Sequence, residues 1–184
     1  MASVDERMEK KGVPKAAVIE NVEEFLNANK LALNEAQKKV EENFRKYKYI
    51  EASVSAQQEK ILLNLPDYKN SLNIIKALSD EKDKGKESID VSYKLAENIY
   101  SKAVVDNIDE VCLWLGASVM VAYDLEEAKQ VLEKNIADIE KWNNDLNEEL
   151  DFIKDQITTT EVNIAHIYNY GVLQKQKEGA SSSK

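Results

Sequence analysis

Cysteine, glycine and proline are scarce in this sequence, and each shortage argues against a class of protein. The single cysteine, Cys112, cannot form a disulfide within the chain, and no Asn-x-Ser/Thr glycosylation site occurs, so a reducing compartment fits best. The 184 residues contain only 5 glycines and 2 prolines, whereas 32% of them are charged. This balance is typical of long solvated helices rather than of a loop-rich compact domain.

Long apolar runs are missing too. No stretch of the sequence approaches the roughly 20 apolar residues that are needed to span a bilayer. The first fifteen residues contain no apolar signal-peptide core, and their acidic residues argue against a mitochondrial transit peptide. We therefore expect no membrane partner and a cytoplasmic protein, with a nuclear role left open.

Clusters of basic residues do not occur either. The formal net charge is -9, and cationic pairs such as Lys38 and Lys39 lie among carboxylates. Because nucleic-acid binding draws its affinity from clustered Lys and Arg, the sequence predicts no nucleic-acid partner.

Motifs for catalysis or nucleotide binding are absent: neither Gly-x-x-x-x-Gly-Lys nor Gly-x-Gly-x-x-Gly occurs. His166, the only histidine, has no metal-ligating neighbours and is expected on a solvated helix face. Cys112 lies on a predicted strand with no histidine nearby, which favours a buried structural thiol over a nucleophile. Four carboxylates are also interpreted as a solvated helix face: Glu148, Glu149, Asp151 and Asp155. We expect no enzyme, no catalytic, cofactor-binding or metal-binding residue, and no cofactor.

What the sequence does contain is two sets of heptads. The first has an apolar residue at every seventh position: Leu33, Val40, Tyr47, Val54, Ile61, Tyr68, Ile75. Its companion line, four residues further on each time, is interrupted by polar residues. The second follows Asp124, a predicted N-cap: Leu125, Leu132, Ile139, Leu146, Ile153, Thr160, Ile167. Helices of roughly 45 to 55 residues would measure about 70 to 80 Å. Their similar lengths predict an antiparallel coiled-coil hairpin.

Pro66 stands inside the first heptad set. A proline there removes a backbone hydrogen bond and crowds the preceding turn, so we expect a kink near residues 64–66. The heptad phase continues beyond it, which predicts one bent helix rather than two.

The connector between the heptad sets changes to a period of two. Apolar residues alternate with polar ones from Ile89 to Leu95, residues 98–105 form a second β-prone run, and two more runs flank Gly116. Four short strands, or two hairpins, are expected. Because two hairpins with apolar residues on both faces are too small to be stable alone, the pattern predicts oligomerisation through this segment. The expected assembly residues are Val111, Leu113, Leu115, Val119 and Val121.

Three segments carry a family resemblance. In order along nearly the whole chain, they resemble segments of the alpha-class subunits of the prefoldin family. They are GVPKAAVIENVEEFL (residues 12–26), EVCLWLGASVMVAYDLEEAKQVLEKN (110–135) and LDFIKDQITTTEVNIAHIYNY (150–170). The sequence after Tyr170 shows no pattern of that family. The boundaries expected are a flexible N-terminal segment (1–20), a first coiled-coil helix (21–84), two β-hairpins (87–123), a second helix (124–170) and a disordered tail (171–184).

The resemblance implies a fold and a function. The fold would be mainly α with a small β part, a long antiparallel coiled-coil hairpin whose two β-hairpins oligomerise into a β-barrel platform. The partners would be one further alpha-class and four beta-class prefoldin subunits in a hetero-hexamer. Such a complex would hold unfolded actin and tubulin without ATP and deliver them to the cytosolic chaperonin.

Client binding would occur at the open end of the coiled coil, because several weak apolar contacts from several arms add up to strong binding. The candidate residues are Val22, Phe25, Leu26, Ile164, Ile167, Tyr168 and Tyr170. Two alternatives stay open. These side chains could pack only on one another, and the chain could be a passive coiled-coil scaffold or tether with a β dimerisation unit.

Overall fold

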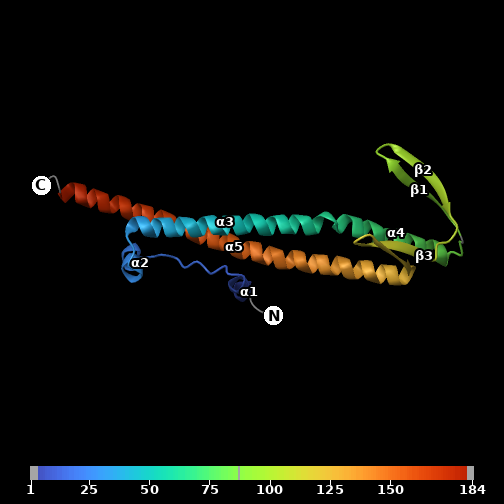
Figure 1. The fold of residues 1–184 in the computed structure, drawn as a ribbon, viewed down its shortest axis with the longest axis horizontal. Coiled ribbons are helices and arrows are strands. Elements are labelled where there is room, and N and C mark those ends of the chain that lie inside the picture. The colour runs from blue at the N-terminus through green and yellow to red at the C-terminus, as the bar shows by residue number, and fades with distance from the viewer. Residues whose placement is uncertain (1–3, 87, 182–184) are drawn as a thin grey trace. The chain divides into compact units, whose positions relative to one another are not determined.

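A computed structural model describes residues 4–86 and 88–181 of the chain. It is mainly α with a small β part, as the sequence predicts, and its helices and strands follow one another as Figure 1 traces them. The chain divides into two compact units, which we describe separately. Unit 1 contains Met1–Glu59 and Asn143–Lys184, and unit 2 contains Lys60–Trp142.

In unit 1, α3 (Leu33–Leu63) runs antiparallel to the later part of α5 (Leu125–Ser181). Val40, near the start of α3, packs in one cluster with Ile167, near the end of α5. At the other end, the Nε2 of Gln58 donates to the Oδ1 of Asn143 at 2.9 Å and to the Oδ1 of Asn147 at 2.6 Å. All seven positions of the second heptad set are buried, so the predicted coiled-coil seam is confirmed.

The helix predicted from residue 21 is interrupted in the structure. A short α2 (Val22–Asn29) begins at Asn21, whose side chain accepts from the backbone N–H groups of Glu23 and Glu24, and it ends at Lys30 with φ 52°. The N–H of Lys30 donates to the C=O of Asn27, and the N–H of Leu31 donates to the C=O of Leu26. This is a Schellman motif, which stops the helix three residues before α3 begins.

Both ends of the chain also differ from the prediction. The segment predicted to be flexible contains α1 (Val4–Lys10), and Met8, Val13 and Ile19 are buried. Where a disordered tail was predicted from residue 171, α5 continues to Ser181, because residues 172–178 are good helix formers even without a heptad. The predicted boundary at residue 87, and residues 1–3 and 182–184, lie outside the described residues.

In unit 2, α4 (Leu65–Asp83) pairs with the first turns of α5. Its Ile75 packs with Leu125, Ala128 and Leu132, and the Nζ of Lys69 lies 3.0 Å from the Oε1 of Glu140. At the predicted kink, the single residue Asn64 separates α3 from α4. Its backbone angles, φ -91° and ψ -10°, remain in the right-handed helical region.

Glycine ends α4. Gly85 adopts φ 78°, its N–H donates to the C=O of Lys82, and the N–H of Lys86 donates to the C=O of Glu81. The ammonium groups of Lys84 and Lys86 both pair with the Glu81 carboxylate. Hydrogen bonds from these two lysines lower the pKa of Glu81 to about 2.

Two antiparallel hairpins follow, at the places predicted. The first pairs β1 (Ile89–Ala96) with β2 (Ile99–Val105), and the second pairs β3 (Glu110–Gly116) with β4 (Val119–Asp124). Ala117 and Ser118 both have positive φ, as a type I′ turn requires. The Oδ1 of Asp124 accepts from the N–H of Glu127 at 2.7 Å, which confirms the predicted cap of α5.

Candidate functional site

The β3–β4 hairpin has one face turned inward and one face exposed. Val111 lies opposite Tyr123, and Leu113 lies opposite Val121. Of these, Val111, Leu113 and Tyr123 pack against the unit 2 cluster around Ile75. The other face is formed by pairs one register step away, Trp114 with Met120 and Cys112 with Ala122. Trp114 is 63% exposed and Met120 57% exposed.

The five predicted assembly residues therefore do not share one surface. Val111 and Leu113 pack within the chain, and Val121 is half-buried. Leu115 and Val119 are exposed, because a register shift between Trp114 and Gly116 ends the strict alternation. Cys112, predicted to be a buried thiol, is exposed instead. Sequence reasoning placed Trp114 and Met120 on the other face or at the rim, but it took Val111 and Leu113 for the assembly face, since a strand with apolar residues on both faces does not indicate which face turns inward.

The β1–β2 hairpin is also rich in exposed apolar side chains. Its five large exposed residues are Tyr93, Leu95, Ile99, Tyr100 and Val104. We call these five together with Trp114, Leu115, Val119 and Met120 the hairpin surface. The two short hairpins thus carry nine large apolar side chains that are exposed in the single chain.

The predicted client-binding residues in unit 1 pack mostly on one another. Val22 and Ile167 are buried in a cluster with Ile19 and Val40. The partly buried side chains against this cluster include Phe25, Leu26, Ile164 and Tyr170. Tyr168 differs because it is 63% exposed. Two exposed apolar residues follow it on α5, Val172 and Leu173.

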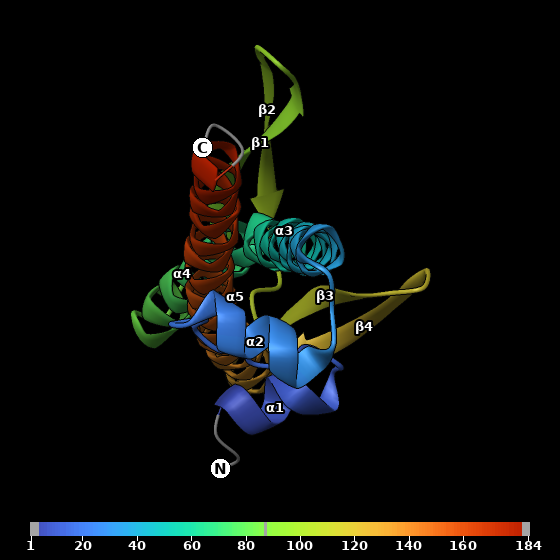
Figure 2. The ribbon, with the colours of Figure 1, turned by 90° about the vertical axis from the view of Figure 1, so that its left-hand side faces the viewer.

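Buried polar side chains on α5 hold the segment between α1 and α2. The Oε1 of Gln156 accepts from the N–H of Ala16 at 2.8 Å. The Oδ1 of Asn163 accepts from the N–H of Ile19 at 2.7 Å, and its Nδ2 donates to the C=O of Ala17 at 2.8 Å. Figures 1 and 2 show α1, α2 and this segment on the same side of the α3–α5 pair. We call residues 13–20 the N-terminal strap.

Two more side chains bind the strap. The Nδ1 of His166 lies 2.8 Å from the C=O of Ile19, so Nδ1 carries the proton and donates. The hydroxyl of Tyr47 on α3 donates to the C=O of Pro14 at 2.9 Å, and burial raises the pKa of Tyr47. A cavity of about 590 Å³ lies beside the strap and is lined by Val40, Tyr47, Thr160 and Asn163 among others.

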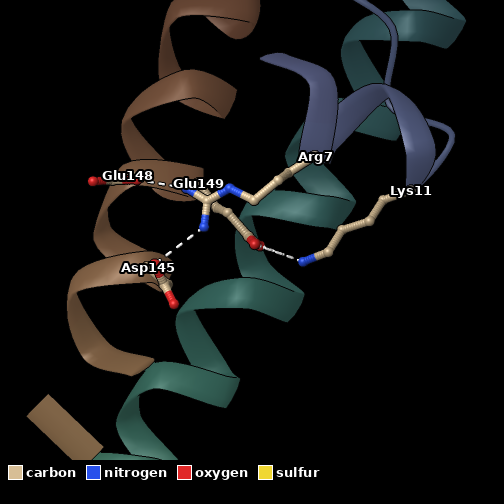
Figure 3. Close-up of polar contacts among 5 residues, drawn as sticks. All are labelled: Arg7, Lys11, Asp145, Glu148 and Glu149. Atoms are coloured by element: carbon tan, nitrogen blue, oxygen red, sulfur yellow. Dashed lines mark hydrogen bonds and ion pairs between the residues drawn. The ribbon is translucent and has the colours of Figure 1, made fainter. Parts of the chain in front are cut away.

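Ion pairs anchor α1 ahead of the strap (Figure 3). The guanidinium of Arg7 binds Asp145 at 3.1 Å and Glu148 at 2.5 Å, and the ammonium of Lys11 binds both carboxylate oxygens of Glu149. The hydrogen bond to Asp145, with that to Glu148, raises the pKa of Arg7. Glu148 and Glu149 are thus not simply part of a solvated face, and the Glu149 side chain is only 7% exposed.

The sequence contained a signal for the binding of Lys11 and the strap to α5. Glu149, Gln156 and Asn163 repeat every seven residues on a line of α5 separate from the apolar seam. All three are at most 5% exposed. A polar line with a heptad period is normally interpreted as solvated, whereas here Lys11 binds Glu149 and the strap binds Gln156 and Asn163.

The part of the chain that the structure describes has neither a metal-binding cluster nor a helix that could span a membrane. Within residues 4–86 and 88–181, no group of three or more His, Cys, Asp or Glu side chains could hold a metal ion. The same residues include no helix whose length and apolar character would carry it across a bilayer.

Comparison with known proteins matches the sequence of the chain to one family. The family Prefoldin, described as Prefoldin subunit, matches residues 47–170. A probable prefoldin subunit 3 of Caenorhabditis elegans is 42% identical over 176 residues, which cover 96% of this chain and 95% of that protein. Prefoldin subunit 3 of Homo sapiens is 38% identical over 175 residues (94% and 88%). That of Saccharomyces cerevisiae is 37% identical over 177 residues (90% and 87%).

Proposed function

The chain belongs to the prefoldin family, and from this membership we propose that it acts as one subunit of a hetero-hexameric co-chaperone. The complex would contain one further alpha-class and four beta-class subunits. It would hold unfolded actin and tubulin chains without ATP and deliver them to the cytosolic chaperonin in the cytoplasm. The observation that carries the proposal is the hairpin surface, which needs partner strands, on a chain whose helices already bury their own seam.

Assembly would use the exposed side of the hairpins. Leu115 and Val119 of the predicted set, together with Trp114 and Met120, are available to a partner. Val111 and Leu113 would act indirectly, by fixing the β3–β4 hairpin on the helices. A β-barrel platform built with other subunits would pair the open strand edges that a two-stranded hairpin leaves.

Client holding would use the end of unit 1 where α2, α3 and the last turns of α5 meet. Tyr168 is the predicted client residue that is exposed, and Val172 and Leu173 extend the same apolar end. The six other predicted residues contribute to the packing that holds this end together. Contacts from several arms would add up, so no single deep pocket is required.

The test is native mass spectrometry of the complex purified through this chain, followed by an aggregation assay with chemically unfolded actin in the absence of ATP. We expect six subunits and suppressed aggregation. A stable complex that leaves actin aggregation unchanged would instead favour the passive scaffold. Transfer is tested by adding purified cytosolic chaperonin, which should take up the held actin.

A further inference from the structure

The strap is held through its main chain. Gln156 and Asn163 are each 4% exposed, and their amide groups bind the N–H of Ala16, the C=O of Ala17 and the N–H of Ile19. The Nε2 of Gln156 is used on its own helix, where it donates to the C=O of Phe152. These contacts involve no polar strap side chain, so they do not depend on a particular strap sequence.

The spacing of the two amides matches an extended chain. Seven residues of α-helix rise about 10.5 Å at 1.5 Å per residue. Three residues of extended chain in the polyproline II geometry advance about 9.3 Å at 3.1 Å per residue and return the N–H to the same side of the chain, which a regular β-strand with its period of two does not do. Gln156 and Asn163 are seven residues apart, and the two N–H groups that they bind are three residues apart. The line on α5 therefore suits any extended polypeptide whose backbone N–H groups repeat at that distance.

The strap is attached by buried apolar side chains, Val13 and Ile19, and by ion pairs of the residues before it, and the ion pairs are the part that is most easily released. The Arg7 side chain is 29% exposed and its partners Asp145 and Glu148 are 44% and 56% exposed, so these ion pairs contribute little in water, whereas Lys11 binds the nearly buried Glu149. Within the strap, Val18 is 57% exposed. Release would uncover Ile167, which is 1% exposed and packs in the same cluster as Ile19.

We propose that the part of α5 beneath the strap, which we call the groove and which carries Gln156, Asn163 and His166, is a main-chain binding site for an extended segment of non-native polypeptide. The chain's own strap occupies it until a client displaces the strap. This inference rests on the proposed holding function. The preferred occupant has small apolar residues preceded by basic ones, because Asp145, Glu148 and Glu149 lie beside the N-terminal approach to the groove.

The first experiment uses a fluorescent peptide with the sequence of residues 4–21 as the probe and the assembled complex with the full chain as the receptor. Arg7→Ala with Lys11→Ala should free the groove and strengthen peptide binding roughly three- to tenfold. Lys134→Ala with Lys141→Ala removes the same charge from exposed positions of α5 in unit 2, outside the hairpins, and should leave peptide affinity unchanged.

Asn163 is then changed in the released background. Asn163→Ala removes two main-chain hydrogen bonds and should weaken peptide binding about tenfold. Asn163→Asp keeps the acceptor for the N–H of Ile19 but loses the donor to Ala17, so it should give an intermediate affinity. Equal peptide affinity in the wild type and the released variant, or no effect of Asn163→Ala, would overturn the inference.

The second experiment follows the backbone amides of Ala16 and Ile19 by hydrogen exchange in the wild-type complex. Adding unfolded actin should remove their protection and displace the labelled peptide from the released variant. If the complex suppresses actin aggregation while both amides stay protected, the groove is not a client site, although the holding function stands. If the complex holds no actin at all, both proposals are wrong, even where the peptide still binds.

Discussion

Removing the exposed side chains of the β3–β4 hairpin should weaken assembly without unfolding the chain. A buried Trp covers roughly 150 to 250 Å², and Trp114 is 63% exposed, so a partner could remove about 100 to 150 Å² of it from water. At about 25 cal/mol per Å² this is roughly 2.5 to 4 kcal/mol, and Met120 adds roughly 1 to 2 kcal/mol. Ordering costs at an interface reduce the sum.

We therefore expect Trp114→Ser with Met120→Ser to cost about 2 to 4 kcal/mol of assembly free energy, which corresponds to roughly a 30- to 1000-fold higher dissociation constant. The assay is a dilution series of the reconstituted complex, with the fraction of intact complex measured by native mass spectrometry. Tyr49→Ser is the matched control, since it removes an aromatic side chain that is 77% exposed on α3, outside the hairpins.

The helical circular dichroism signal of the double variant should equal that of the wild type, because neither side chain belongs to the unit 2 cluster. Leu113→Ser, on the inner face of the same strand, should lower the unfolding temperature instead. Our account of the two faces would be refuted if the double variant dissociated at the same concentration as the wild type and the Tyr49→Ser control.

Three further predictions concern single side chains. The pKa of Glu81 is about 2, below the ordinary 4.5. Its pairing with the two lysines therefore stabilises the end of α4 fully above pH 4.5, and this stabilisation is lost as the pH falls through 2. Carboxyl NMR titration should show this pKa, and replacing both lysines with Ala should return it toward 4.5. Asp124→Ala removes the cap of α5 and should cost about 1 kcal/mol, seen as faster hydrogen exchange in its first turn. Ile153→Ala, at a site with 0% exposure, should lower the free energy of unfolding by roughly 2 to 5 kcal/mol. Val162→Ala, at 41% exposure, should change it by less than about 0.5 kcal/mol.

The features that the sequence predicted well are periodic. An apolar residue at every seventh position defines one face of a helix, so Leu132, Ile153 and Ile167 could be assigned to the seam without a structure. Strand alternation and the turn at Gly116 located the hairpins for the same reason. The family resemblance, which the comparisons confirm, rested on two runs within these periodic segments and on residues 12–26, which precede them.

The features that the sequence did not predict depend on contacts between segments of which at least one has no repeating sequence pattern to reveal the contact. The strap is extended and bound through its backbone, so its own residues carry no repeating pattern. Both faces of β3 are apolar, and only the packing of Leu113 on the helices shows which face is inward. Burial of the tip residues around Ile167 likewise requires the position of Ile19, which periodicity does not provide.

The match between a heptad of α5 and three residues of the strap also limits how the two segments can change in length. Adding one heptad to α5 between Gln156 and Asn163 would require three more residues between Ala16 and Ile19 to keep both hydrogen bonds. A single inserted residue in the strap would turn an N–H away from its amide, and a single inserted residue in α5 would rotate Asn163 by about 100° around the helix. Viable insertions and deletions in this part of the chain should therefore occur as coupled steps of seven and three residues.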